Sequence, residues 1–254
     1  AVKAVDSGLI GEPIHALAHG KGYYGGYGIM NIGCHLLTQM QAFLGRCQRV
    51  NASLRTNGRP IQPEDVVPSP QGMGTIAGEN LSAELEFEGG VNATLVHNRL
   101  PSVRRGSNRF QILGTEGRIL FQQGEAWHSP TPFASPADGV DRWIKIPREI
   151  GRQFDSNALS RERPDEMDYV EEYVRALDAG NDHESSGAVG THSLEMIMGV
   201  FESAAYSRPV ELPQQRRDHP LIRWRSDNGM SSLPAAPRPY KDWLAHEDRR
   251  LGRS

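Results

Sequence analysis

Apolar residues recur at helical spacing in three stretches of the chain. The first stripe consists of Ile29, Ile32, Leu36, Met40 and Phe43. Gly45 follows it at a position typical of a helix end. The other two stripes lie within residues 165–177 and 194–205, and they are more typical of helices packed on a sheet than of ligand-binding surfaces. The pattern therefore predicts three amphipathic helices.

Alternation of apolar and polar residues predicts strands elsewhere. The clearest pair flanks Gly89-Gly90, a two-residue connection typical of a β-hairpin. The segments that we interpret as strands are 13–19, 49–56, 81–88, 91–97, 109–114, 118–121 and 143–146. Residues 57–78 are rich in Gly and Pro, and we predict loops there and at 122–139.

The two ends of the chain lack such patterns. Residues 1–5 are typical of the end of a helix without a cap, so we expect a domain cut from a longer protein. From residue 214 onward the chain is rich in Arg and Pro. We predict an extended C-terminal arm over 214–254, with a short helix at Tyr240–Asp248.

Composition excludes some classes of function. The 254 residues carry a formal net charge of −3, which favours neither a nucleic-acid nor a membrane partner. No run of about 18 apolar residues is present. Cys34 and Cys47 are the only cysteines, which indicates a reducing compartment, and we expect a cytoplasmic location. Neither cysteine belongs to a ligand set with metal spacing, so no metal site is predicted.

The candidate chemistry lies around the first helix. Asn31 and His35 are four residues apart and would share a helix face directly after a glycine-rich turn. An imidazole suits proton transfer because its pKa lies near ~6.5. Lys21, Tyr24 and His97 are weaker candidates for binding a substrate. The alternatives are that the tyrosine packs on the helix and that the histidine lies on the sheet surface.

Three glycines before this helix, at positions 20, 22 and 25, match G-x-G-x-x-G. We reject a dinucleotide-binding loop there. The preceding strand is not the continuous apolar run of a parallel sheet, and no acidic residue ends a second strand about 20 residues later.

Three motifs in sequence order resemble the C-terminal domain of the Gfo/Idh/MocA oxidoreductases. They are Gly-Gly-x-Gly-x-x-Asn-x-Gly-x-His at 25–35, Asp-Ser-Gly-Leu-Ile-Gly-Glu-Pro at 6–13, and the segment from Glu202 to Pro213. The resemblance covers residues 1–213. It implies an α+β fold with a large open, predominantly antiparallel sheet and helices packed on one face.

The resemblance also implies a function. In that family an Asp-x-x-x-His pair transfers a proton beside a nicotinamide cofactor. His35 matches the histidine, and Asn31 stands in place of the aspartate. NAD or NADP would be bound mainly by a separate Rossmann domain that this chain lacks, so the chain alone is expected to be inactive. The open sheet face would form a homo-oligomer.

We therefore expect the substrate domain of a sugar or polyol oxidoreductase, with His35 in acid/base work and Asn31 orienting it. The alternative is a non-catalytic module that dimerises or binds a partner through its sheet. A glycosidase that works through transient oxidation is a third reading, and it would need the same cofactor.

Overall fold

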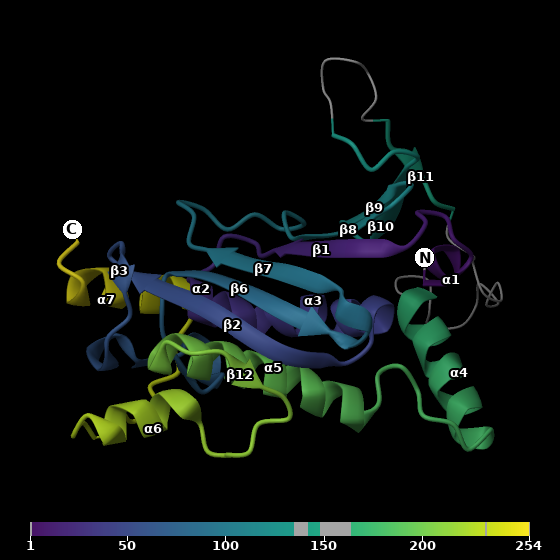
Figure 1. The fold of residues 1–254 in the computed structure, drawn as a ribbon. Helices are drawn as coiled ribbons and strands as arrows, with labels where there is room; N and C mark the ends of the chain where they lie inside the picture. The colour runs from purple at the N-terminus through teal and green to yellow at the C-terminus, as the bar shows by residue number, and fades with distance from the viewer. Residues whose placement is uncertain (1, 135–141, 148–163, 232, 254) are drawn as a thin grey trace.

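The computed structural model describes residues 2–134, 142–147, 164–231 and 233–253. Within these residues ten strands form one open sheet in the order β11-β10-β9-β8-β1-β7-β6-β2-β12, with β3 paired to β2 (Figure 1). Neighbouring strands are antiparallel, except that β1 and β7 are parallel. The expected α+β fold with a predominantly antiparallel open sheet is confirmed.

The strand bounds follow the alternating segments closely. The strands of this sheet are β1 (Pro13–His19), β2 (Cys47–Thr56), β3 (Arg59–Pro60), β6 (Asn80–Phe87), β7 (Asn92–Asn98), β8 (Arg109–Gly114), β9 (Arg118–Gln122), β10 (Glu125–Ser129), β11 (Ile144–Lys145) and β12 (Val210–Glu211). A separate two-stranded sheet joins β4 (Val67–Pro68) to β5 (Thr75–Ile76). The prediction of a loop over 122–139 was wrong for β10, whose residues do not alternate in burial, and residues 135–139 lie outside the described residues.

One face of the sheet carries the helices and the core. On β6 the side chains alternate strictly, so Leu81, Ala83, Leu85 and Phe87 are buried while the residues between them are not. This alternation continues across β7, β1 and β8. The opposite face has half-exposed residues, among them Leu17, Thr94 and Gln111, which are register partners on adjacent strands.

The helices are α1 (Val2–Asp6), α2 (Gly25–Gly28), α3 (Cys34–Leu44), α4 (Pro164–Asp178), α5 (Gly187–Tyr206), α6 (Pro220–Asp227) and α7 (Tyr240–Arg250). A π-helical turn, η1 (Ile29–Gly33), joins α2 to α3. Short 3-10 turns lie at η2 (Pro63–Asp65), η3 (Pro70–Gly72) and η4 (Glu88–Gly90). No described helix is long and apolar enough to cross a lipid bilayer.

Helices α3 and α5 cover the sheet side by side. Thr38 Oγ1 lies 3.0 Å from Ser193 Oγ, and Gln41 Nε2 donates to the same hydroxyl at 2.7 Å. Ser203 on α5 accepts a hydrogen bond from the backbone N–H of Ala52 in β2. Of the stripe predicted at 194–205, Ile197, Phe201 and Ala205 are buried as expected, whereas Leu194 is exposed.

The stripe on α4 differs from that expectation. Met167, Val170, Val174 and Leu177 are exposed rather than packed on the sheet. In Figure 1 this helix stands beside the sheet rather than across its face. The helix predicted from the periodicity is confirmed, but periodicity alone does not say which surface the apolar face contacts.

The C-terminal region also differs from an extended arm. Residues 220–227 and 240–250 form α6 and α7, and the second of these confirms the short helix predicted there. Trp243 is buried, and its Nε1 donates to the carbonyl of Pro68 at 2.8 Å. The arm thus folds back on the domain and covers the start of α2.

Candidate functional site

The site lies on one continuous helical run from Gly25 to Leu44. Its buried side includes Ile29, Leu36 and Met40, as the apolar stripe predicts. The run ends at Gly45, whose φ of 79° is readily adopted only by glycine. The π-helical turn in its middle was not predicted, and Asn31 lies within it. Such turns are often found at functional sites.

The glycines at the start of this run allow it to approach the sheet. A Cβ on Gly25 would lie 2.9 Å from the carbonyl oxygens of Glu79 and His97, and one on Gly26 would overlap the carbonyl of Ala77. The backbone N–H groups of Gly25 and Gly26 donate to Glu79 O and Gly78 O at 2.8 and 2.9 Å.

These contacts also decide whether the glycine-rich segment could bind the phosphates of a dinucleotide. The N–H of Gly20 donates to Val96 O, so it too is occupied. A phosphate-binding loop needs N–H groups that are free to point at the phosphate. With three of these groups already bonded to carbonyls, the loop does not fit a dinucleotide pyrophosphate.

His35 is exposed on α3, at the first turn after η1. Asn31 is half-buried, and its Nδ2 donates to the Tyr27 hydroxyl at 3.1 Å and lies 3.8 Å from Met73 Sδ. Among the hydrogen bonds of the described residues, none joins Asn31 to His35. The two side chains are on the same helical run, but the bond expected between them is not formed.

Tyr24 lies in the interior rather than at a surface. Its side chain is 0% exposed beneath α7, with the ring edge-on to Trp243 at 5.0 Å. Its hydroxyl donates to Glu247 Oε1 at 3.2 Å. Burial, together with the Glu247 carboxylate, raises the pKa of Tyr24 well above its usual value. Lys21 is half-buried in the loop before α2.

His97 is also interior, at 2% exposure. Its ring fills a space bounded by three glycines. A Cβ on Gly28 would lie 2.7 Å from its Nδ1, one on Gly33 would lie 3.2 Å from its Nε2, and one on Gly20 would overlap the ring. Burial, with a smaller effect of His19, lowers the pKa of His97 to about 3, so the ring is neutral near pH 7. Its Nε2 has no hydrogen-bond partner among the described residues.

Three residues that the sequence analysis missed surround Asn31. Tyr27 accepts from Asn31 and donates to Gln71 Oε1 at 2.7 Å, while Met73 contacts the same amide. Gln71 and Met73 come from the 57–78 segment, which has no periodicity. Tyr27 did offer a signal, since it lies one helical turn before Asn31.

A cavity of about 340 Å³ lies beside η1. Its lining includes Met30, Gly74, Leu194, Met198, Arg217 and His219. This volume falls in the range of small-molecule pockets. Asn31 and His35 are not among its lining residues.

The described residues contain no group of His, Cys, Asp and Glu that could hold a metal ion. Cys34 and Cys47 are free thiols. Burial raises the pKa of the Cys47 thiol to about 12, which makes it a weak ligand and nucleophile.

Comparison with known proteins supports the resemblance seen in the sequence. Residues 1–120 match the family model described as the GFO/IDH/MocA C-terminal domain. Among curated proteins, no relative matches the chain.

Solved structures share the fold at low identity. Levoglucosan dehydrogenase in complex with NADH and levoglucosan is 18% identical with a TM-score of 0.59, covering 84% of this chain and 62% of that one. An NAD binding oxidoreductase from Klebsiella pneumoniae is 17% identical with a TM-score of 0.60 and the same coverage. An oxidoreductase domain protein from Kribbella flavida is 20% identical, at 0.59 and the same coverage.

The chain thus spans about three fifths of the length of these structures. The family match over residues 1–120 includes the whole site-bearing helix, and the fold continues beyond it. Residues 1–120 are thus similar to the C-terminal domain of the Gfo/Idh/MocA oxidoreductases, and the solved structures share the fold over most of the chain.

Proposed function

We propose that this chain is the substrate domain of an NAD(P)-dependent oxidoreductase that acts on a sugar, polyol or related hydroxy compound. The observation that carries the proposal is the exposed imidazole of His35, on the helix that follows the glycine-rich turn in the family-matched segment. A histidine packed into the sheet-facing core could not reach a substrate, whereas this one lies on the solvent side of α3.

The substrate class is inferred from the relatives. Levoglucosan dehydrogenase was solved with NADH and levoglucosan and with NADH and L-sorbose, and an Agrobacterium radiobacter oxidoreductase with NAD+, L-tartaric acid and magnesium. These ligands all carry secondary hydroxyl groups. A hydroxyl that is oxidised must lose a proton as well as a hydride.

In this proposal His35 accepts the hydroxyl proton, and Asn31 orients the imidazole once the two approach each other. Lys21 donates hydrogen bonds to other hydroxyls. We leave out Tyr24 and His97, because both are buried away from any substrate. NAD or NADP is the hydride acceptor, and it is held mainly by residues outside this chain, since three backbone N–H groups of the glycine-rich segment are already bonded to carbonyls.

The open sheet face is proposed to pair with a second copy of the chain. It carries Leu17, Val96, Leu113 and Leu120, which are half-buried in this chain. An apolar strip of this kind is stabilised when another surface covers it. The two free thiols are consistent with a reducing compartment such as the cytoplasm.

The test is hydride transfer by the natural protein that carries this chain, followed by NAD(P)H absorbance with a panel of sugars, polyols and hydroxy acids. His35→Ala is expected to lower the rate by about 100-fold or more, the usual contribution of a general base. His246→Ala, at an exposed position on α7, is the control and should keep the parent rate. Equal, measurable rates for parent and His35→Ala would remove His35 from the mechanism. No hydride transfer by the parent with any compound of the panel would favour the non-catalytic module that pairs through its sheet.

A further inference from the structure

The Asn31 amide is held by a directed chain of hydrogen bonds. Its Nδ2 donates to the Tyr27 hydroxyl, and that hydroxyl donates its single proton to Gln71 Oε1. An amide whose nitrogen is committed to Tyr27 leaves its oxygen directed away from Tyr27. The orientation of the Asn31 acceptor thus depends on where the Tyr27 hydroxyl lies.

Tyr27 is in turn held by the C-terminal helix. Its ring, 2% exposed, stacks on Tyr240 with centroids 5.1 Å apart and planes inclined by 19°. Tyr23 contacts both rings edge-on, at 5.2 and 4.8 Å. The Tyr240 hydroxyl accepts a hydrogen bond from the backbone N–H of Tyr24 at 2.8 Å. One side chain from α7 therefore fixes both the entry to α2 and the ring that holds Asn31.

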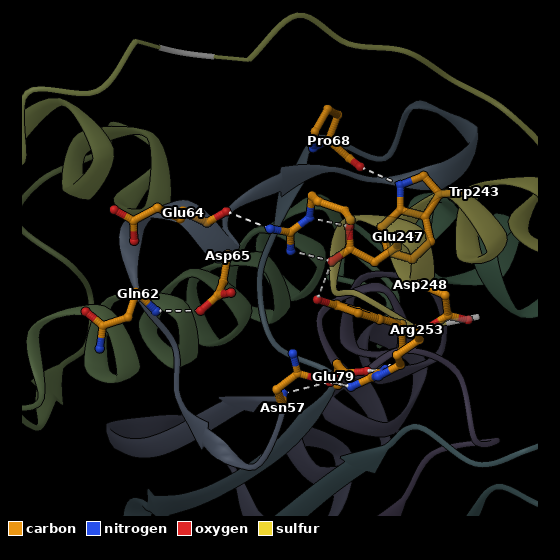
Figure 2. A network of polar contacts seen from close by, with 12 residues as sticks. Asn57, Gln62, Glu64, Asp65, Pro68, Glu79, Trp243, Glu247, Asp248 and Arg253 are labelled. Carbon is orange, nitrogen blue, oxygen red and sulfur yellow. Dashed lines mark hydrogen bonds and ion pairs between the residues drawn. The ribbon is translucent and has the colours of Figure 1, made fainter.

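The rest of α7 and Arg253 after it are attached at several points, of which Figure 2 shows those of Trp243 and Arg253. Trp243 donates to the Pro68 carbonyl, and Asp248 accepts two hydrogen bonds from Arg99 at 2.7 and 2.8 Å. Arg253 pairs with Glu79, whose own backbone carbonyl accepts from Gly25. Because Glu79 bonds both Arg253 and Gly25, these contacts hold Tyr240 in place relative to the site helix.

We infer that Tyr240 is a positioning residue for the candidate site, acting on Asn31 through the ring of Tyr27. The inference rests on the proposed function only in treating Asn31 as a site residue. In physical terms, Tyr240 sets the direction of the Asn31 amide, although Tyr240 lies 216 positions from Tyr24 at the start of the site helix.

The test follows the Asn31 side-chain amide by NMR in the full chain labelled with ¹⁵N-asparagine, the signal being assigned by its loss in Asn31→Ala. Tyr27→Phe keeps the ring stack but removes the hydroxyl. It is expected to shift the Asn31 signal and to speed its hydrogen exchange by about 3- to 10-fold, the factor for loss of one hydrogen bond. Tyr240→Leu removes the stack without touching Asn31, and it should change the same signal.

Two control variants separate positioning from general stability. Asp248→Asn weakens the salt bridges of α7 with Arg99 and Arg253 but leaves Tyr240 in contact with Tyr27. It should therefore lower the unfolding midpoint without moving the Asn31 signal. Tyr240→Phe keeps the stack and should preserve the signal even where Tyr240→Leu does not fold.

An Asn31 signal that is unchanged in Tyr27→Phe, or unchanged in a folded Tyr240→Leu, would overturn the inference. A signal that moves in Asp248→Asn as much as in Tyr240→Leu would also overturn it, because general loosening of α7 would then suffice. None of these outcomes depends on catalysis. A failure of the His35 experiment is therefore distinguishable from a failure here.

Discussion

Removing the charge of Glu79 tests how the C-terminal helix is attached to the domain. The Glu79 side chain is 5% exposed and accepts hydrogen bonds from Arg99 Nη1 at 2.9 Å, from the backbone N–H of Asn57 at 2.9 Å, and from Arg253. Burial by itself raises the pKa of Glu79. The donors, Arg253 above all, outweigh burial and lower the pKa from 4.5 to about 2.

The size of the effect follows from this difference. Between a pKa of 4.5 and one of about 2, the charged form gains about 3 kcal/mol in the folded state, at ~1.36 kcal/mol per pKa unit. Because Arg253 is 36% exposed, solvent screening makes this an upper value. The pKa is lower in the folded state, so the stabilisation is fully present above about pH 4.5 and is lost as the pH falls toward about 2.

Glu79→Gln cannot titrate, so the free energy of unfolding of this variant should lie below that of the parent by up to about 3 kcal/mol near neutral pH. The difference in unfolding free energy between the parent and Glu79→Gln should become smaller as the pH falls below about 4.5. Urea unfolding followed by circular dichroism at a series of pH values measures it. Other carboxylates are common to both proteins, and their titration largely cancels in the difference.

Glu184→Gln, at an exposed position before α5, is the matched control and should follow the parent at every pH. A gap for Glu79→Gln that stays constant across the acid range would refute the reasoning, because the lost stability would then owe nothing to the carboxylate charge.

Three further predictions address other parts of the molecule. Residues 1–254 alone should not quench NADH fluorescence at micromolar concentrations, and clear saturable quenching would contradict a cofactor held mainly elsewhere. Leu113→Lys on the open sheet face should shift the mass seen by light scattering from oligomer to monomer, whereas an unchanged mass would exclude pairing through this face. Gly26→Ala should lower the free energy of unfolding by several kcal/mol, about the cost of severe overpacking, because its Cβ would overlap the Ala77 carbonyl. Gly187→Ala, with open space around it, should change stability by less than ~0.5 kcal/mol in the same urea assay.

The sequence predicted those parts of the fold in which side-chain period and burial agree. The site helix was found because Leu36, Leu37 and Met40 meet the core, and its end was found because Gly45 has positive φ. The π turn was missed because it changes backbone hydrogen bonding without changing residue type. On α4 the helical period was predicted correctly, but its apolar face is exposed, and no surface among the described residues packs against it.

The candidate site was predicted in part. His35 is exposed, as proton exchange with a substrate requires, and its acid/base role stays a prediction. His97 carried a signal that could have been used, since it lies in phase with Ala93 and Leu95 on the buried side of β7. The burial of Tyr24 carried none, because it is created by Trp243 and Glu247 on a helix more than 200 residues away in sequence. Local pattern cannot reveal a cover supplied by a distant segment.

The amide at position 31 fits its surroundings better than its resemblance to an Asp-x-x-x-His pair suggests. Tyr27 has one hydroxyl proton, and Gln71 Oε1 receives it, so the neighbour at position 31 must be a donor. A carboxylate there could only accept, and it would compete with Gln71 for that proton unless the Gln71 amide turned over. Asn31 satisfies Tyr27 with its nitrogen and still has an oxygen to offer to an imidazole N–H. In the proposed enzyme, His35 would therefore be oriented by a neutral partner, which directs the ring without stabilising its charged form.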